Sequence, residues 1–509
     1  MTDLSTIFKA YDIRGRIDNG ELTSDGAMRI GAAFAQFVAP APVCIGWDCR
    51  SSSVPLAESF IKGARSAGAN VTSLGETVTD IVYYVSGAHQ MAGAMITASH
   101  NPPEYNGIKL CGPSAQAIGA ESGLVAIRSA AEAYEATDSP PGELTSLNPI
   151  PGYLDHLFSI VDATAISEMT VAVDGGNGTA GLVVGPAFDR IAPSLIGLYL
   201  DPDGSFPNHP ANPLEPENLR DLLEVVKKQH PDIGVAFDGD ADRVFFVDET
   251  GSPLSGSATT ALIARWFLAS EPGAGIVHNL ITSRAVPEIV SEHGGVPIRA
   301  RVGHSFIKQV MAETGAVFGG EHSGHYYFRD NYRADSGMLA MLILMQIVSE
   351  SGVRLSVLAS DVEPYYQSGE LNFTVSDKPA AITRIGEAFD GPHDDLDGLT
   401  VDVGASWFNV RASNTEPVLR VNVEGPTDSG VEEIVSQLTE LIANDLPVGA
   451  SEPSNAAVHD SLRSLLVCPL CRGELSDEPN ALVCVTDGLR FAIVQGIPNM
   501  IIQDAEVIS

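Results

Sequence analysis

Short apolar runs that end in polar, glycine-containing loops recur along this chain and predict buried strands. Val43–Trp47 is such a run, and a helical pattern follows it over 54–67. Thr170–Asp174 and 275–277 open units of the same kind, the latter continuing as the helical pattern Ala285–Glu292. Strand, loop and helix in this order build α/β domains. Three openings spaced by more than a hundred residues predict three α/β domains of one general design.

One apolar run is longer than these strands. Residues 338–348 are too few to cross a bilayer, which takes about 20 residues, and they predict a buried helix. The N-terminus lacks the basic and apolar regions of a secretory signal. A length of 509 residues corresponds to about three or four domains. These features predict a cytoplasmic enzyme that does not bind a membrane.

The charge balance narrows the classes of partner. Against 65 acidic residues the chain has 29 basic ones, which gives a formal net charge of −36. This charge repels nucleic acid and anionic membranes, so we expect neither as a partner. An anionic substrate needs the few basic residues gathered at its site. Six cysteines in a chain this long are no disulfide framework, and three of them cluster near the C-terminus.

The segment 97–109 carries the first candidate chemistry. It follows the apolar run 94–96, and its Asn-Pro and Asn-Gly pairs favour turns over helix. Ser99 is therefore predicted in an exposed loop. Serine is a poor nucleophile without help, and His100 and Lys109 are candidates for that help. An ordinary serine in a surface turn is the alternative.

A glycine pattern in the second unit matches a dinucleotide-binding fingerprint. Gly176, Gly178 and Gly181 follow a strand, and Asp201 ends a later apolar run at a suitable spacing. Against this function, Pro186 is expected to interrupt the helix that would hold the pyrophosphate.

Three carboxylates alternate in the loop Asp238-Gly239-Asp240-Ala241-Asp242, between two apolar runs. Such charge density is unfavourable without a cation, and these hard oxygen ligands suit Mg²⁺. An EF-hand loop is a poor alternative, because its sixth position would be Arg243 where glycine is needed. An aspartyl-phosphate enzyme, with Asp238 as nucleophile and Asp240 as acid, stays open, as does a solvated acidic turn.

Further groups suited to a sugar phosphate lie elsewhere. Arg14 precedes a glycine turn, from which its guanidinium can reach an anion. The segments 301–308 and 319–325 carry imidazole, hydroxyl and carboxylate groups that suit sugar hydroxyls. The segment 411–417 and the nearby Arg420 predict a phosphate-binding loop. The alternative for His304 and His325 is that they are ordinary buried histidines. The alternative for 411–417 is the capped start of a helix.

Four motifs in order carry a family resemblance: Thr97-Ala98-Ser99-His100-Asn101-Pro102, Asp238-Gly239-Asp240-Ala241-Asp242-Arg243, Gly320-Glu321-His322-Ser323-Gly324-His325 and Arg411-Ala412-Ser413-Asn414-Thr415. Together they resemble the α-D-phosphohexomutase family, in its phosphomannomutase/phosphoglucomutase branch, from about Phe8 to Leu446. The resemblance implies three similar α/β domains with mixed sheets and a smaller α+β fourth domain around a central cleft. The expected domains span 1–148, 149–252, 253–365 and 366–446.

The family implies interconversion of hexose 1-phosphate and hexose 6-phosphate, of mannose, glucose or both. A phosphoserine enzyme and a hexose 1,6-bisphosphate intermediate, which also serves as activator, are implied with it. Alternatives are a non-catalytic scaffold that presents a partner-binding domain, or a phosphoglucosamine mutase, which His322 disfavours.

The residues and the resemblance together nominate three groups of site residues. The catalytic candidates are Ser99, His100, Lys109, Arg14, His304, His325 and Arg243. The Mg²⁺ ligands are Ser99, as phosphoserine, with Asp238, Asp240 and Asp242. The substrate-binding candidates are Glu321, Ser323, His325, Arg411, Ser413, Asn414, Thr415 and Arg420.

Beyond a polar linker at 447–457, residues 458–509 resemble the small Trm112-like domain, a zinc-ribbon-related fold. Cys468 and Cys471 form one C-x-x-C pair, but the second pair is Cys484 with Asp487. Three sulfurs and a carboxylate can bind Zn²⁺, and a metal-free hairpin domain is the alternative. Related proteins use this fold to bind partners, so a protein partner is a hypothesis here. The sequence carries no signal for oligomeric state.

Overall fold

The computed structural model describes residues 3–135, 140–375, 377–413, 418–443, 466–471, 473, 475–478, 481–494, 497–498 and 505–507, with only the backbone at 304, 492–494, 497 and 506–507. The chain divides into two compact units. One is Met1–Thr374 with Lys378–Leu438, and the other is Val375–Asp377 with Thr439–Ser509. The predicted linker at 447–457 lies outside the described residues.

The first sheet is mixed, in the order β1-β5-β4-β2-β3-β7, with β6 paired to β5. Strands β4, β2, β3 and β7 run parallel, and β5 turns back antiparallel to β4. Its elements are β1 Ile13–Arg16, α1 Ser24–Val38, β2 Val43–Trp47, α2 Ser53–Ser66, β3 Val71–Glu76, α3 Thr79–His89, β4 Ala92–Ile96, β5 Tyr105–Gly112, η1 Pro113–Ala115, β6 Gln116–Ala117, η2 Ala120–Leu124, α4 Val125–Glu132 and β7 Leu144–Ser146.

The second sheet has the order β11-β10-β8-β9. Only the hairpin pair β10 and β11 is antiparallel. Its elements are α5 Ile150–Ile160, β8 Thr170–Asp174, α6 Gly181–Phe188, β9 Ser194–Leu198, η3 Pro216–Leu219, α7 Arg220–Gln229, β10 Ile233–Phe237 and β11 Val244–Asp248.

The third sheet has the order β13-β12-β14-β15-β16. Its parallel part is β13, β12 and β14, and β15 turns back antiparallel to β14. Its elements are α8 Gly256–Ser270, β12 Gly275–Asn279, α9 Ala285–Glu292, β13 Val296–Ala300, α10 His304–Thr314, β14 Phe318–Gly320, β15 Tyr326–Phe328, η4 Arg329–Asn331, β16 Ala334–Asp335, α11 Gly337–Ser351 and α12 Leu355–Ser360.

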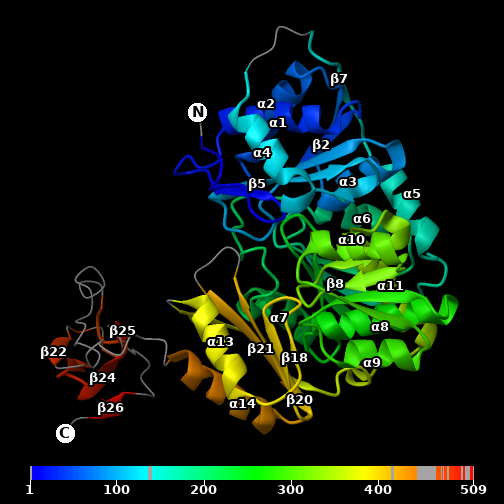
Figure 1. Ribbon diagram of the computed structural model, residues 1–509. Coiled ribbons are helices and arrows are strands. Elements are labelled where there is room, and N and C mark those ends of the chain that lie inside the picture. The colour runs from blue at the N-terminus through cyan, green and yellow to red at the C-terminus, as the bar shows by residue number, and fades with distance from the viewer. Residues whose placement is uncertain are drawn as a thin grey trace. The chain divides into compact units, whose positions relative to one another are not determined.

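These three sheets share one topology, as predicted. The part of the chain that carries them runs from blue to yellow-green in Figure 1. The orders β5-β4-β2-β3, β11-β10-β8-β9 and β15-β14-β12-β13 correspond strand for strand. The three apolar runs that suggested a repeat are β2, β8 and β12, which occupy the same place in each sheet. In each sheet the neighbouring parallel strand, β4, β10 or β14, is followed by a hairpin loop. That loop leads into the antiparallel strand β5, β11 or β15.

The fourth sheet is wholly antiparallel, with two helices, as expected of an α+β domain. Its order is β17-β21-β20-β19-β18. Its elements are β17 Tyr366–Thr374, α13 Lys378–Ala388, β18 His393–Asp394, β19 Leu399–Val403, β20 Ser406–Ala412, β21 Val418–Gly425 and α14 Asp428–Ala443.

The C-terminal unit is a small antiparallel sheet, β22-β23-β24-β25, with β26 beside β24. The strands are β22 Ser476–Glu478, β23 Ala481–Cys484, β24 Leu489–Val494, β25 Ile497–Pro498 and β26 Glu506–Val507. Among the described residues of this unit, the apolar core consists of a small cluster that includes Leu482 and Phe491. A core this small gives little stabilisation, and such domains commonly rely on a metal or disulfides.

The predicted buried helix is α11. Residues 338–345 have no exposed surface, and they pack with α8 in one core that the first three sheets share. A helix that is apolar on all sides is stable in water only when it is covered on all sides. Among the described helices, none is both long and apolar enough to span a bilayer.

The glycine pattern after β8 serves packing. A Cβ on Gly178 would lie 2.6 Å from the Gly239 carbonyl oxygen, and one on Gly181 would lie 1.8 Å from that of Leu200. The Thr179 amide donates to the Gly239 carbonyl at 3.0 Å. The acidic loop thus occupies the space where a pyrophosphate would bind. The expected break at Pro186 was wrong, because α6 continues two residues beyond it, to Phe188.

Candidate active site

Three hairpin loops meet in the larger unit, one from each of the equivalent sheets. Each follows the carboxyl end of the same strand: β4 leads to Ser99, β10 to Asp238 and β14 to Glu321. The Arg243 and His325 backbones form an isolated antiparallel bridge, and the Gly324 carbonyl accepts from the Val244 amide at 3.2 Å. The second and third loops are therefore joined through their backbones, and the first packs against the second.

The Ser99 hydroxyl lies between the Asp238 carboxylate and the Arg243 guanidinium, both in the second loop. Its Oγ donates to Asp238 Oδ2 at 2.7 Å and accepts from Arg243 Nη2 at 3.0 Å. His100 Nδ1 lies 3.3 Å from the same oxygen. Arg243 also binds Asp238 Oδ2 through Nε at 3.0 Å, so the guanidinium and the carboxylate hold each other beside the hydroxyl.

The prediction that Ser99 is exposed was wrong. The residue is only 4% exposed, because the acidic loop covers it. A Cβ on Gly239 would lie 2.4 Å from the Ser99 carbonyl oxygen, a contact that only glycine allows. Ser99 also has a φ of 55°, in the left-handed region that costs a non-glycine residue about 1–3 kcal/mol. Turn residues indicate a loop but do not reveal what packs over it.

The three carboxylates of the second loop are buried together. Asp238 and Asp240 have no exposed surface and Asp242 has 2%. Lys109 Nζ binds Asp240 Oδ2 at 2.6 Å and also contacts Asp242. The Thr79 hydroxyl donates to the same Asp240 oxygen at 2.6 Å. Lys109 and Arg243 neutralise two of the three negative charges, which leaves one charge to be balanced.

This cluster fits a divalent cation. One oxygen from each of Asp238, Asp240 and Asp242 lies within 4.8 Å of the others. Asp240 Oδ1 and Asp242 Oδ1 are buried and have no hydrogen-bond donor among the described residues. Buried carboxylate oxygens without donors are costly unless a cation binds them. The loop joins two strands, which also excludes the helix-flanked EF-hand geometry.

The third loop gathers groups that suit a sugar. Glu321 accepts from Ser323 Oγ and from Tyr327 Oη, each at 3.0 Å. Ser323 Oγ also lies 3.0 Å from His325 Nδ1. The other ring nitrogen of His325 lies 3.7 Å from Asp242 Oδ1, which brings this imidazole to the edge of the carboxylate cluster.

Burial sets the protonation of these groups. It lowers the pKa of His325 to about 4, with Arg243 and Lys109 adding to the effect and Asp242 opposing it. Burial likewise lowers the pKa of His100, next to Arg243. Burial raises the pKa of Asp238 to about 7, with repulsion from Asp240 and Asp242, although Arg243 opposes it. Both imidazoles are therefore neutral near pH 7.

Two catalytic candidates remain, Arg14 and His304, and the structure describes the side chain of Arg14 alone. Arg14 donates to Asn101 Oδ1 at 2.5 Å, so it lies beside the Ser99 loop, and its other terminal nitrogen pairs with Asp12 at 2.5 Å. His304 is the first residue of α10, but its side chain lies outside the described residues.

The fourth-domain arginines pair with a neighbouring acid. Arg411 and Arg420 face each other across β20 and β21, and both bind Glu370 of β17, Arg420 at 3.1 Å. The Ser413 carbonyl accepts from Lys378 Nζ at 3.0 Å. The charge of Arg411 acts on Glu321, which places it within electrostatic reach of the third loop. Asn414 and Thr415 lie outside the described residues.

The sequence patterns did not indicate three residues that bind the site groups: Thr79, Arg50 and Glu370. Thr79 binds Asp240, Arg50 binds the Ser99 carbonyl, and Glu370 binds Arg411 and Arg420. Each of the three is remote in sequence from its partner, and none belongs to a local motif. Arg50 stood in the polar segment that follows the first apolar run, which was a signal of position without an indication of role.

A cavity of about 960 Å³ lies apart from these groups. Residues from the parts of the chain that carry the first and third sheets line it, among them Tyr11, Gln116, Arg301, Lys308 and Arg333. None of the nominated site residues with described side chains lines it. The geometry of the carboxylate cluster, rather than cavity volume, therefore locates the chemistry.

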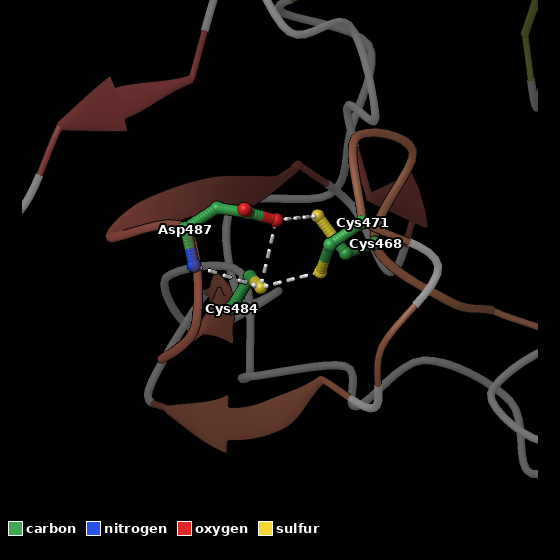
Figure 2. Close-up of side chains that lie close together, drawn as sticks. All are labelled: Cys468, Cys471, Cys484 and Asp487. Atoms are coloured by element: carbon green, nitrogen blue, oxygen red, sulfur yellow. Dashed lines mark hydrogen bonds between the residues drawn. The ribbon is translucent and has the colours of Figure 1, made fainter.

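The C-terminal unit holds the predicted sulfur cluster (Figure 2). Cys468 and Cys484 approach Asp487 Oδ2 at 3.1 and 3.3 Å, and the Cys471 and Cys484 sulfurs lie 3.5 Å apart. The Gly473 amide donates to Cys471 and the Asp487 amide to Cys484, each at 3.4 Å. One atom from each of the four residues lies within 4.8 Å of the rest.

Family profiles cover most of the chain. Four profiles described as phosphoglucomutase/phosphomannomutase match in order: alpha/beta/alpha domain I at 5–137, domain II at 151–251, domain III at 255–365 and the C-terminal domain at 370–441. A Trm112p-like profile matches 460–496.

Curated relatives and solved structures agree with these profiles. A protein of Xanthomonas campestris named "Phosphohexose mutases" is 40% identical over 440 residues, with 84% of this chain and 97% of the relative covered. The phosphomannomutase of Escherichia coli is 37% identical over 456 residues, covering 86% and 99%. A phosphoglucomutase/phosphomannomutase family protein of Burkholderia thailandensis superposes with a TM-score of 0.80 at 30% identity, covering 88% and 99%.

The pH dependence of stability tests the burial of Glu321. Burial raises the pKa of its carboxyl from 4.5 to about 7. A raised pKa means that the folded chain holds the proton more tightly, so this contribution is complete below about pH 4.5 and is lost as the pH rises through about 7. Glu321→Gln cannot titrate. We expect the melting temperature of the wild type minus that of the variant to decrease between about pH 5 and pH 8.

Glu58→Gln, at an exposed position of α2, is the matched control, and its difference from the wild type should vary less over this range. A difference for Glu321→Gln that stays constant across the range would contradict the burial argument.

Proposed function

Because this chain belongs to the phosphoglucomutase/phosphomannomutase family, we propose that it interconverts the 1- and 6-phosphates of mannose, glucose or both through a phosphorylated Ser99. The chain is a phosphohexomutase, an enzyme that moves a phosphoryl group within a hexose phosphate. The observation that carries the residue assignment is the contact of Ser99 Oγ with both Asp238 and Arg243, beside the carboxylate cluster.

The metal assignment rests on the two donor-free oxygens of Asp240 and Asp242. Asp238, Asp240, Asp242 and the phosphoserine oxygen would hold Mg²⁺. When bound, the ion would balance charge on the phosphoryl oxygens, which is the main requirement of phosphoryl transfer. Lys109 and Arg243 add fixed positive charge on either side of the same group.

The reaction has two transfers. In the first, the bond from phosphorus to Ser99 Oγ breaks and a bond to the free sugar hydroxyl forms, giving a hexose 1,6-bisphosphate. In the second, Ser99 Oγ takes the other phosphoryl group, and the sugar oxygen that is left regains a proton. Arg243 neutralises the serine oxygen each time it is released, because its guanidinium already lies 3.0 Å from it.

His325 is our choice for the group that takes the sugar hydroxyl proton. Above its raised pKa of about 7, Glu321 is ionised and can only accept, so Ser323 then donates its one proton to Glu321 and accepts from the Nδ1–H of His325. The other ring nitrogen then carries a lone pair at the edge of the carboxylate cluster. Lys109 is less suited, because the Asp240 and Asp242 charges outweigh its burial and raise its pKa.

The remaining candidates would bind the sugar and its second phosphate. Glu321 and Ser323 can accept from and donate to sugar hydroxyls. Arg411, Ser413, Asn414, Thr415 and Arg420 would hold the phosphate that is not reacting, with Arg14 and His304 at the reacting end. Parallel assays with mannose, glucose, glucosamine and N-acetylglucosamine 1-phosphates identify the preferred sugar. Activity restricted to the amino sugars would contradict the proposed branch.

Replacement of the nucleophile tests the assignment directly. We expect Ser99→Ala to lower kcat to about 1% of wild type or less, because no other hydroxyl lies between Asp238 and Arg243 among the described residues. Turnover with each sugar 1-phosphate measures the effect. Ser129→Ala should keep wild-type rates, because Ser129 is exposed on α4 and its hydroxyl donates to the Val125 carbonyl.

Phosphopeptide mapping separates this assignment from the aspartyl-phosphate alternative. An acid-stable phosphate on Ser99 agrees with the proposal. A hydroxylamine-labile phosphate on Asp238 would replace it with the alternative.

We also propose that Cys468, Cys471, Cys484 and Asp487 bind Zn²⁺. One ligand atom from each lies within 4.8 Å of the others, and two backbone amides donate to the sulfurs, which would stabilise charged thiolates. The small core that the described residues of this unit form gives a physical reason for a metal. The carboxylate in place of a fourth thiolate should make binding weaker than in a four-cysteine site.

Zinc content of the full-length chain tests this proposal. We expect about one zinc per wild-type chain, with a lower content in Cys471→Ser and tighter binding in Asp487→Cys. The comparison between variants is needed because the carboxylates of the larger unit can also take up zinc. A folded wild-type protein with the same zinc content as Cys471→Ser would exclude the site.

We further propose that the C-terminal unit binds a protein partner. Three large apolar residues of this small unit are exposed: Val467 at 48%, Leu470 at 59% and Val485 at 80%. All three stand next to ligands of the sulfur cluster in sequence, so the zinc site would hold them in place. Burial of such side chains is the usual driving force of association.

Deletion of 447–509 should then leave hexose phosphate turnover within about twofold of wild type, since the proposed catalytic residues lie outside it. A partner found by cross-linking should be lost with Leu470→Ser and Val485→Ser but kept with Glu478→Gln, an exposed polar control. A partner that binds these apolar variants as well as wild type would contradict the assigned surface. Activation by hexose 1,6-bisphosphate and a cytoplasmic location stay predictions.

A further inference from the structure

Arg50 is a buried arginine near the proposed active site whose side chain is fully hydrogen-bonded. It follows β2 and is 2% exposed. A guanidinium has five N–H donors, and here each donates once. The acceptors are Asp48 Oδ2 at 3.0 Å for Nε, the Ser99 and Asn101 carbonyls at 2.8 and 2.6 Å for Nη2, and the Pro102 and Tyr105 carbonyls at 2.7 and 3.2 Å for Nη1.

Four of these five acceptors belong to one loop. Arg50 thus holds the carbonyls on both sides of the turn that follows the nucleophile. It also binds the carbonyl of Ser99 itself, the residue whose φ of 55° is unfavourable. The Thr97 hydroxyl binds the amide of the same residue at 2.9 Å. A strained conformation persists only where its surroundings determine it, and these bonds do so from both sides of Ser99.

The guanidinium itself is fixed by its neighbours. Asp48 receives Arg50 Nε on one oxygen, and Ser53 Oγ at 2.5 Å on the other. The Phe206 ring covers the guanidinium at 4.9 Å, and it comes from the loop after β9 in the second sheet. A Cβ on Gly204 would lie 2.5 Å from the Arg50 Cα, so this loop closes tightly over the arginine.

These contacts exclude an anion-binding role for Arg50. Its five donors are used, and the stacked ring and the loop cover it. It does not contact the reacting atoms either, because the part of Ser99 that it binds is the carbonyl and not the hydroxyl. Its effect on chemistry must therefore act through the position of the loop.

We propose that Arg50 is a positioning residue that keeps Ser99 Oγ facing Asp238 and Arg243 while the phosphoryl group leaves and returns. The inference rests on the proposed role of Ser99. Each transfer changes the charge on Ser99 by about two units. Arg243 and Asp238 therefore exert a different electrostatic force on the loop when Ser99 is phosphorylated and when it is free. Within this loop Arg50 binds only neutral carbonyls, so its hold is the same in both.

The test replaces the planar guanidinium of Arg50 by another side chain of the same charge. Lysine has a single ammonium group, which cannot reach four carbonyls from this place. We expect Arg50→Lys to lower kcat about 100-fold, the effect of a misplacement of about 1 Å, while KM for hexose phosphate changes less than about threefold. Amide hydrogen exchange at 99–105 should become faster, with exchange in β8 and β10 unchanged.

Arg65→Lys is the matched control. Arg65 lies on α2 in the same part of the chain and donates to one backbone carbonyl, that of Gly142, at 2.8 Å. It contacts no residue of the Ser99 loop in the described structure, so its kcat should match wild type. A purely structural role for Arg50 would lower the melting temperature without the selective loss of kcat at temperatures well below it.

The outcomes separate this inference from the proposed function. If Arg50→Lys keeps wild-type kcat and exchange, the positioning role is wrong, while the loss of activity in Ser99→Ala still supports the nucleophile. If Ser99→Ala keeps activity, the proposed function itself fails. If Arg50→Lys does not fold, Asp48→Asn decides. This variant weakens the bond that holds Arg50 Nε and leaves the residues of the Ser99 loop unchanged. It should lower kcat by a smaller factor than Arg50→Lys. An unchanged kcat would overturn the inference.

Discussion

The arrangement of this enzyme depends on the cost of burying three carboxylates together. Asp238, Asp240 and Asp242 are almost fully inaccessible to water, and Lys109 and Arg243 neutralise only two of their charges. Like charges at this spacing are tolerable only where cations and donors surround them. The first loop supplies Ser99 and the following strand β5 supplies Lys109, while the second loop supplies Arg243 and α3 supplies Thr79. The electrostatic requirement thus ties the first two domains into one site.

Much of the fold follows from local patterns in the sequence. The runs at β2, β8 and β12 were recognisable because a buried parallel strand is almost entirely apolar, and their equal places in three sheets confirm the predicted repeat. The motifs after β4, β10 and β14 were recognisable because chemistry at strand ends uses short, unusual runs of polar residues. Helix α11 was evident because an apolar stretch of its length has few other interpretations.

What the sequence did not reveal depends on contacts between distant segments. The burial of Ser99 comes from Gly239, some 140 positions away, and the full bonding of Arg50 comes from carbonyls that carry no side-chain signal. Glu370 binds both Arg411 and Arg420 from another strand. Pro186 shows the opposite limit, because α6 accommodates a proline that local rules predicted would stop it. Propensity describes a preference that tertiary packing can override.

The shared topology of the first three domains has a consequence for how such an enzyme can change. Three hairpins of one design meet at one place, and the proposed function gives each a different part of the chemistry. In that proposal one carries the attacking hydroxyl, one the acidic ligands and one the sugar contacts. Backbone contacts of Arg243 with His325 and of Val244 with Gly324 join the last two. Under that proposal, substitutions at Glu321 and Ser323 of the third hairpin can alter which carbohydrate is accepted while the nucleophile and the acidic ligands stay unchanged on the other two. A division of labour among duplicated units would let one scaffold serve many sugars.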